Sequence, residues 1–225
     1  MKRYLFSTAL LFFSSLVFSQ KLSQVSLAGG LSYFTIYSDP GVSIRISPDG
    51  KILEYGTELV SDRGGYYAPK LQPYLGRLEY YGPQADSAFR GKVKSIGTSS
   101  ITYYGSYETE FKAGKLRSIG TLTLDYYTNY DNAALRGKLR FIGSLILEYY
   151  PSIDDEAVRG KLKSIGSTPL KYYSSFDDRY LRGKIKSIGT VAIDYYTAMD
   201  RAELRGQLRS GFYRPNVGGI TFILQ

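Results

Sequence analysis

The 225-residue sequence contains no cysteine, no histidine and no tryptophan. Without cysteine the chain has neither a disulfide nor a thiol nucleophile. Without histidine it lacks the commonest general base and the usual ligand of transition metals. Serine and threonine are plentiful, but no base is present to activate them. These absences predict a protein that is not an enzyme and that holds no cofactor.

Carboxylate chemistry is the catalytic alternative that composition leaves open. Two adjacent acid pairs, Asp154 with Asp155 and Asp177 with Asp178, are the groups that calcium binding or acid–base work would use. Each pair stands where a loop is expected to begin a helical turn, however, and an acid there caps free backbone N–H groups. We therefore interpret the pairs as caps and expect no catalytic and no metal-ligating residue. A carboxylate-dependent hydrolase stays the second alternative.

The first residues have the pattern of a secretory signal peptide. Lys2 and Arg3 precede an apolar stretch at 4–18, and small Ser19 follows. The stretch is shorter than the roughly 20 residues of a membrane-spanning helix, and we expect cleavage before Gln20. The mature chain is then predicted to be exported, in the periplasm, at the cell surface or outside the cell, with no transmembrane span.

Charge points to the class of partner. Cleavage leaves 27 basic residues against 20 acidic ones, a net charge of +7. A basic excess favours polysaccharide or another anionic polymer as partner, and nucleic acid is not expected in this location. The competing interpretation is that the charge only keeps the protein soluble.

Most of the chain is one short unit repeated at a fixed period, which is the signature of a repeat architecture. Each copy carries an Arg-Gly-Lys-like step and ends in a pair of tyrosines. Because the period never slips, insertions are excluded from strands and loops alike. The glycines stand 23 residues apart at 91, 114, 137, 160, 183 and 206, and the tyrosine pairs at 80/81, 103/104, 126/127, 149/150, 172/173 and 195/196.

Within a unit, residues 115–127 alternate polar and apolar side chains, which predicts strands and not a helix. The Ile-Gly-Thr step in the middle is expected to turn. A three-residue loop at 119–121 pairs Leu116 with Leu124 and Lys115 with Asp125, so that apolar meets apolar and charge meets opposite charge. A two-residue loop mixes them, and we therefore predict the longer loop.

The fourth copy is expected to pair most weakly. There Lys161 is predicted to face Lys171, and Pro169 interrupts the second strand. Between the units, an aspartate before Ala-x-Leu and a glycine just after it predict a capped single helical turn. Its apolar residue, for example Leu135 or Val158, is expected to fold over the sheet.

The predicted fold is all-β, with tandem 23-residue β-hairpin repeats forming an elongated antiparallel sheet. A parallel β-helix is the alternative if the chain bends at the Ile-Gly step. The expected divisions are a signal peptide at 1–19, an N-terminal β cap region at 20–75, the repeat array at 76–210 and a C-terminal capping strand at 211–225. The predicted core residues are Val93, Leu116, Leu139, Leu162, Ile185 and Leu208 in the first strands and Ile101, Leu124, Leu147, Leu170 and Ile193 in the second strands.

Some motifs resemble known repeat families. The hairpin at 48–52, the Tyr130-Asp131 and Phe176-Asp177 steps and the Gly-Lys-Leu steps resemble the tyrosine-aspartate repeats of exported surface proteins, and the unit has the length of a MORN repeat. The spacing from aspartate to glycine is longer than in the first family, and the Gly-x-Gly and tryptophan positions of the second are missing. The resemblance covers residues 78–210 and implies a hairpin-built sheet.

The outward face suggests a binding surface. In the predicted register the strand cations, Arg117, Arg140 and Lys186 among them, share a face with the second tyrosine of each pair, and loop arginines fall opposite the same rings. A ladder of rings and cations suits a glycan or a polyanion. A surface or extracellular binding module is the predicted function, and a structural scaffold that self-associates is the first alternative. The predicted ligand face consists of Tyr104, Tyr127, Tyr150, Tyr173, Tyr196, Arg136, Arg159, Arg182, Lys115, Lys138 and Lys184.

Overall fold

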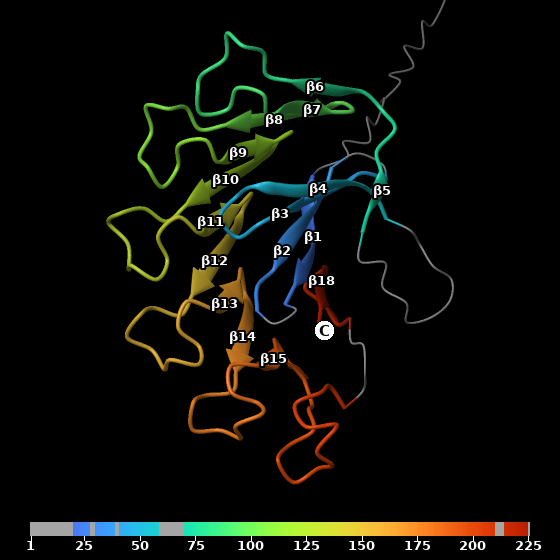
Figure 1. The fold of residues 1–225 in the computed structure, drawn as a ribbon, viewed down its shortest axis with the longest axis vertical. Coiled ribbons are helices and arrows are strands. Elements are labelled where there is room, and N and C mark those ends of the chain that lie inside the picture. The colour runs from blue at the N-terminus through green and yellow to red at the C-terminus, as the bar shows by residue number, and fades with distance from the viewer. Residues whose placement is uncertain (1–19, 28–29, 39–40, 59–69, 210–213, 225) are drawn as a thin grey trace, which may run out of the picture.

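The computed structural model describes residues 20–27, 30–38, 41–58, 70–209 and 214–224, and in these residues the chain is all-β (Figure 1). Their strands form two sheets. One has eleven strands in the order β16 to β6, and the other has seven in the order β17-β18-β1-β2-β3-β4-β5. We call them the array sheet and the covering sheet. The expected signal peptide at 1–19 lies outside the described residues.

The array sheet is built from the repeats. Each strand pairs antiparallel with its neighbours in the sequence, so the hairpin-repeat fold is confirmed and the parallel β-helix is wrong. Its strands are β6 Leu78–Tyr80, β7 Val93–Ile96, β8 Ser99–Tyr103, β9 Leu116–Ile119, β10 Leu122–Tyr126, β11 Leu139–Ile142, β12 Leu145–Tyr149, β13 Leu162–Ile165, β14 Thr168–Tyr172, β15 Ile185–Ile188 and β16 Val191–Ala192.

The hairpin turn is shorter than predicted. Ile119 pairs with Leu122, and Ser118 pairs with Thr123, which leaves a two-residue loop of Gly120 and Thr121. Gly120 has a φ of +56°, whereas the residue after it keeps a negative φ. That combination fits a type II′ turn, whose twist matches the twist of the paired strands. The three-residue loop is wrong.

A β-bulge between units explains why the shorter loop does not spoil the core. Asp125 pairs with Phe141 and Tyr126 pairs with Leu139, so Arg140 is an extra residue without an opposite partner. The bulge lets Leu139 and Ile142, three positions apart, both point to the interior, where each is buried. Strict alternation would have placed them on opposite faces. The same shift recurs at each junction from β6–β7 to β14–β15.

Two expected charge contacts do not form in this register. Lys115 donates a hydrogen bond to the carbonyl of Gly137 and does not pair with Asp125. The carboxylate of Asp125 instead forms an ion pair with Lys112, with 2.6 Å between Oδ1 and Nζ. The fourth copy is not the weak point, because Lys161 donates to the carbonyl of Gly183 as its counterparts in other copies do. Pro169 lies in the complete strand β14, opposite Ser164. Its carbonyl accepts the N–H of Gly189, a bond that needs no donor from proline.

The covering sheet packs on one face of the array. Within it, β1 pairs in parallel with β18, so the first and last parts of the described chain lie side by side. The hairpin predicted around Pro48-Asp49-Gly50 is present between β3 and β4. The strands of the covering sheet are β1 Lys21–Ser26, β2 Tyr33–Tyr37, β3 Ser43–Ile46, β4 Ile52–Thr57, β5 Gln72–Pro73, β17 Asn216–Val217 and β18 Ile220–Ile223.

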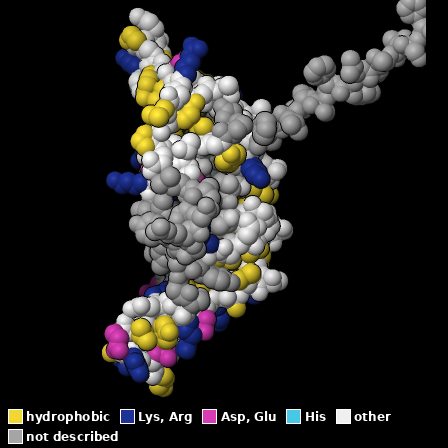
Figure 2. All heavy atoms as spheres, turned by 90° about the vertical axis from the view of Figure 1, so that its right-hand side faces the viewer, with side chains coloured by type: hydrophobic (Ala, Val, Ile, Leu, Met, Phe, Trp, Pro, Cys, Tyr) yellow, Lys and Arg dark blue, Asp and Glu magenta, His cyan; other side chains and the backbone are white. Residues whose placement is uncertain are grey.

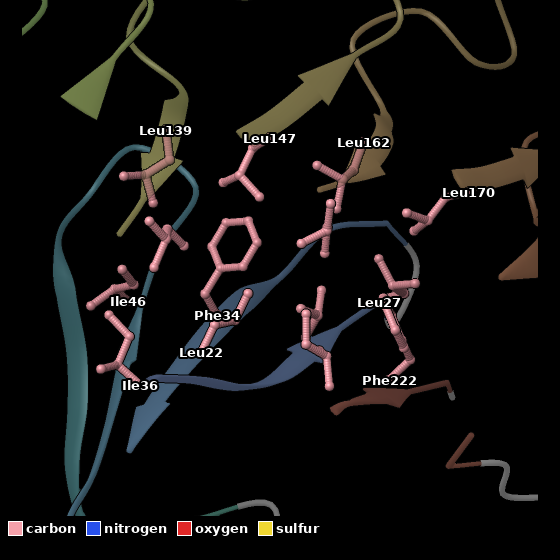
Figure 3. Packing of buried hydrophobic residues seen from close by; sticks show 14 of the residues in the cluster. Leu22, Leu27, Phe34, Ile36, Ile46, Leu139, Leu147, Leu162, Leu170 and Phe222 are labelled. Carbon is pink, nitrogen blue, oxygen red and sulfur yellow. The ribbon is translucent and has the colours of Figure 1, made fainter. Parts of the chain in front are cut away.

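The core lies between the two sheets. Figure 3 shows leucines of the array, such as Leu139 and Leu162, pointing toward Phe34, Leu22 and Phe222 of the covering sheet. The inner face of the array is therefore closed to solvent by residues that lie before and after the repeats in the sequence. Of the eleven predicted core residues, nine are buried, and Val93 and Leu208 are partly buried against the same cluster.

Candidate ligand face

The opposite face of the array is open, and a column of cations runs along it. In β7, β9, β11, β13 and β15, the first strand of each hairpin, the member of the column is the second residue of the strand. This residue is the extra one at the bulge, and its side chain points outward. Every copy has a lysine or arginine there, and every one is exposed. The cation column consists of Lys94, Arg117, Arg140, Lys163, Lys186 and Arg209.

Each cation from the second to the sixth lies over the second tyrosine of the preceding pair. Arg117 stands 5.8 Å from the ring centroid of Tyr104, and Arg209 stands 4.9 Å from that of Tyr196. Both distances are in the range of cation–π attraction. The remaining pairs are Arg140 over Tyr127 at 5.4 Å, Lys163 over Tyr150 at 5.9 Å and Lys186 over Tyr173 at 5.1 Å.

Three of these tyrosines are held by the next repeat through their hydroxyls. Tyr104 donates its hydroxyl to the carbonyl of Leu124 at 2.9 Å, and Tyr127 donates to that of Leu147 at 2.8 Å. Tyr150 makes the same contact with the following unit, as does Tyr81 in the first copy. Burial raises the pKa of Tyr104 to about 12. These rings are thus fixed in place, and the cations above them are exposed to solvent.

The lysines predicted for the ligand face serve another purpose. Lys115 lies 4.9 Å from the ring of Tyr126, a first tyrosine that is buried, and Lys138 lies 5.1 Å from that of Tyr149. Lys138 donates to the carbonyl of Gly160 in the next loop at 2.5 Å, and Lys184 likewise contacts Gly206. Desolvation lowers the pKa of Lys115 and of Lys138. These lysines tie neighbouring loops together.

The loop arginines do not reach the rings predicted for them. Arg136 donates to the carbonyl of Asp131, and Arg182 donates to that of Asp177, each within its own loop. Arg159 makes the equivalent bond to Asp154. The expected pairs with Tyr150, Tyr173 and Tyr196 are wrong, because each arginine follows the turn of its loop and folds back over it. All three side chains are exposed at the loop edge of the sheet.

The adjacent acids act as caps. Asp155 accepts the N–H of Ala157 in its own loop and the N–H of Ser175 in the next loop. Asp178 does the same with Tyr180 and Ala198. The hydroxyl of Ser175 also donates to Asp155 and is the main reason why the pKa of that carboxyl is lowered, whereas the backbone N–H groups of Ala198 and Tyr180 lower the pKa of Asp178. Over the described part of the chain, no three acidic side chains gather as they would around a metal ion.

The open face carries acids as well as cations. Glu79 pairs with Arg77 at 2.6 Å, Asp125 with Lys112 at 2.6 Å and Asp194 with Arg209 at 3.2 Å, and Glu148 accepts a hydrogen bond from the hydroxyl of Ser164. Four members of the column make no ion pair within the described residues, namely Arg117, Arg140, Lys163 and Lys186. Figure 2 looks at the other side of the molecule, where the covering sheet lies in Figure 1, and shows acidic and basic side chains together toward the lower end.

The cation column was within reach of the sequence. An unbroken series of basic residues at a period of 23 marks it, and three members were placed on the outward face. It was missed as a set because strict alternation gives no reason to separate the bulge cation from the lysine two residues before it.

Among the described residues, no helix has the length and apolarity needed to cross a membrane. Comparison with protein-family models, with curated proteins and with solved structures finds no match to this chain.

Proposed function

We propose that the protein is an exported, non-enzymatic binding module that takes a linear anionic polymer, best an anionic polysaccharide, on the open face of its array. The observation that carries the proposal is the row of exposed cations without an acidic partner in the described part of the chain, at intervals of one repeat. Each repeat contributes two strands, so successive cations stand about 10 Å apart. A rigid row of equal charges suits a partner that carries negative charge at regular intervals, which a polymer does. Export rests on the signal pattern at 1–19.

Charge and not ring stacking is expected to dominate the affinity. Arg140 and Lys163 lie over the rings of Tyr127 and Tyr150, whose hydroxyls are already bonded to backbone carbonyls. A sugar ring therefore has no free aromatic face to stack on at these positions. Binding should depend on salt, because each cation that contacts the polymer releases a condensed counterion.

The test measures binding to dextran sulfate and to polygalacturonate over a series of salt concentrations, with neutral dextran as the blank. The variant Arg117→Gln, Arg140→Gln, Lys163→Gln removes three charges from the column. The matched control Arg136→Gln, Arg159→Gln, Arg182→Gln removes three charges from the loops. We expect the slope of log K against log salt to fall by roughly two to three for the column variant, close to one per cation. Equal losses in both variants, or retention by the column variant, contradict the proposal.

The structural scaffold is the alternative, favoured by the edge strand β6, which is paired only with β7 among the described strands. A free strand edge is a surface on which a second copy can add. Light scattering of the purified protein separates the two functions. Chains that join edge to edge increase in mass with concentration, whereas a monomer at all concentrations contradicts the scaffold.

A further inference from the structure

A second row of side chains, apolar this time, occupies the tips of the loops. Five consecutive loops carry a large apolar residue at the same position, and each is 80–96% exposed. In Figure 1 these loops project from one edge of the array sheet. These side chains do not belong to the hydrophobic core, although five of the six loops of the array carry one, the first loop having Gln84 at this position. The apolar tips are Tyr107, Tyr130, Ile153, Phe176 and Met199.

The loops that carry the tips are braced. Asp155 bonds the backbone of its own loop and of the next, and Lys138 and Lys161 join the same loops through glycine carbonyls. Backbone bonds close each loop at its base, for example from the N–H of Gly160 to the carbonyl of Tyr150. The tips are therefore fixed relative to one another and are exposed because the fold holds them outward.

An arginine lies beside each of the last four tips. Arg136 donates to the carbonyl of Asp131, the residue that follows Tyr130. Meanwhile the carboxylate of Asp131 turns back to the N–H of Thr128, away from the tip. Arg159, Arg182 and Arg205 bond the residues after Ile153, Phe176 and Met199 in the same way. Each of these loops thus presents an apolar side chain with a guanidinium next to it, and two of the loops also carry an exposed acid, Glu156 or Glu203.

We propose that this loop edge docks on a phospholipid bilayer, with the apolar tips in the acyl boundary and the arginines at the phosphates. The tips differ in shape, being aromatic, branched or thioether, and share only apolarity. A protein pocket or a sugar ring selects shape, whereas a fluid acyl layer accepts any apolar side chain. A spacing of about 10 Å from loop to loop also leaves the tips too far apart to form one continuous hot spot. Guanidinium groups complement phosphate by charge and by hydrogen-bond geometry.

This surface is separate from the cation column and does not depend on it. The column lies on the face of the sheet, whereas the tips lie on the loops beyond its edge. Binding through apolar tips should persist in 1 M salt, where the Debye length is only about 3 Å, whereas binding of a polyanion should not. The column variant Arg117→Gln, Arg140→Gln, Lys163→Gln should therefore keep its affinity for vesicles, and failure of one proposal leaves the other testable.

Because the sequence has no tryptophan, a single introduced tryptophan can report whether a loop tip inserts into the bilayer. Phe176→Trp places the single indole at a tip, and Ile146→Trp places it on the open face of the sheet, where Ile146 is half-exposed. With vesicles of phosphatidylcholine and phosphatidylglycerol, we expect the emission of the first to shift to the blue and to be quenched by brominated acyl chains. We expect no change in the second. Unchanged emission from the tip indole overturns the proposal.

Affinity provides the second measurement. Tyr130→Ser, Ile153→Ser, Phe176→Ser should lower partitioning into the same vesicles by about tenfold for each side chain. The matched control Leu53→Ser, Leu75→Ser, Ile146→Ser removes three exposed apolar side chains elsewhere and should partition as the parent does. An unchanged melting temperature shows that the tip variant is folded, as expected for side chains that are 90–94% exposed. Equal losses in both variants, or loss of self-association in place of loss of vesicle binding, overturn the proposal.

Discussion

The two sheets of this protein are stabilised in opposite ways. The array repeats one set of contacts between neighbours, such as the hydroxyl of Tyr104 on Leu124 and that of Tyr127 on Leu147, each 20 residues along. The covering sheet depends on contacts that occur once, such as the ion pair of buried Arg45 with partly exposed Glu54 and the pairing of β1 with β18. Losing one contact in the array leaves its copies in place, whereas losing one in the covering sheet leaves no substitute.

The sheets meet at a contact that joins the two kinds of structure. The N–H of Leu139 donates to the carbonyl of Pro48 at 2.8 Å, and that of Leu116 donates to Gly50 at 3.3 Å. Both donors stand beside a bulge, where the ladder of the array is locally disrupted. The tip of the β3–β4 hairpin thus satisfies backbone groups that repetition alone leaves free.

Alkaline pH should have the largest effect, and it should act on the array. Of the tyrosines whose pKa is raised, all except Tyr55 lie in the array. Burial raises the pKa of Tyr126 and of Tyr149 well above 10.0. Above about pH 10 the unfolded chain loses these protons and the folded chain keeps them, so stability falls by about 1.4 kcal/mol per pH unit for each such tyrosine.

Lysines oppose this trend without reversing it. Desolvation lowers the pKa of Lys115 and Lys138 in the folded state. The destabilisation that comes from burying their charge therefore decreases as the pH rises toward 10.5. They are only partly buried, and the tyrosines are more numerous. Urea unfolding followed by circular dichroism between pH 8 and pH 11 checks the result. A midpoint that is constant or rises above pH 10 contradicts it, and Tyr149→Phe should make the loss less steep.

Gly50→Ala should have the next largest effect, because it breaks the contact between the sheets. Gly50 has a φ of +79°, and an added Cβ would lie 1.9 Å from the hydroxyl oxygen of Tyr126. Backbone strain and a clash in the core together should cost about 3 kcal/mol or more of unfolding free energy. The matched control is Gly91→Ala, with a φ of +75° and open space around it, which should cost only about 1 kcal/mol. Denaturant unfolding measures both, and equal costs would show that the hairpin tip is not seated on the array.

The smallest effect is expected from removing the hydroxyl of a tyrosine at equivalent positions in two copies of the repeat, Tyr126 and Tyr149. Tyr126 donates to the carbonyl of Leu116 at 2.7 Å, beneath the covering hairpin, whereas the buried hydroxyl of Tyr149 has no partner among the described residues. Tyr126→Phe should therefore cost about 1 kcal/mol, and Tyr149→Phe should be neutral or stabilising. Thermal unfolding of the two variants, side by side, checks the sign. A larger loss for Tyr149→Phe would mean that the copies do not differ as the structure shows.

Some features could be predicted from residue pattern alone. Alternation within 115–127 predicted hairpins, and the constant period predicted that they would lie side by side, antiparallel. Register could not be predicted, because a pattern of polar and apolar residues does not show which residue is bulged. Arg136 was misplaced for the same kind of reason, since the direction of a loop is set by its turn and not by its distance along the chain.

The sequence by itself determined the repeating unit, its strands and the burial of leucines such as Leu116, because a local alternation repeated at one interval allows few other arrangements. Only the tertiary structure decided what covers the inner face of the array and which of the strand cations remain on the open face. That choice depends on contacts between residues far apart in the chain, such as Phe34 and Leu162, and on the bulges that turn the cations outward. Packing between distant segments creates no periodic pattern in the sequence of either segment, and the sequence alone therefore does not predict it.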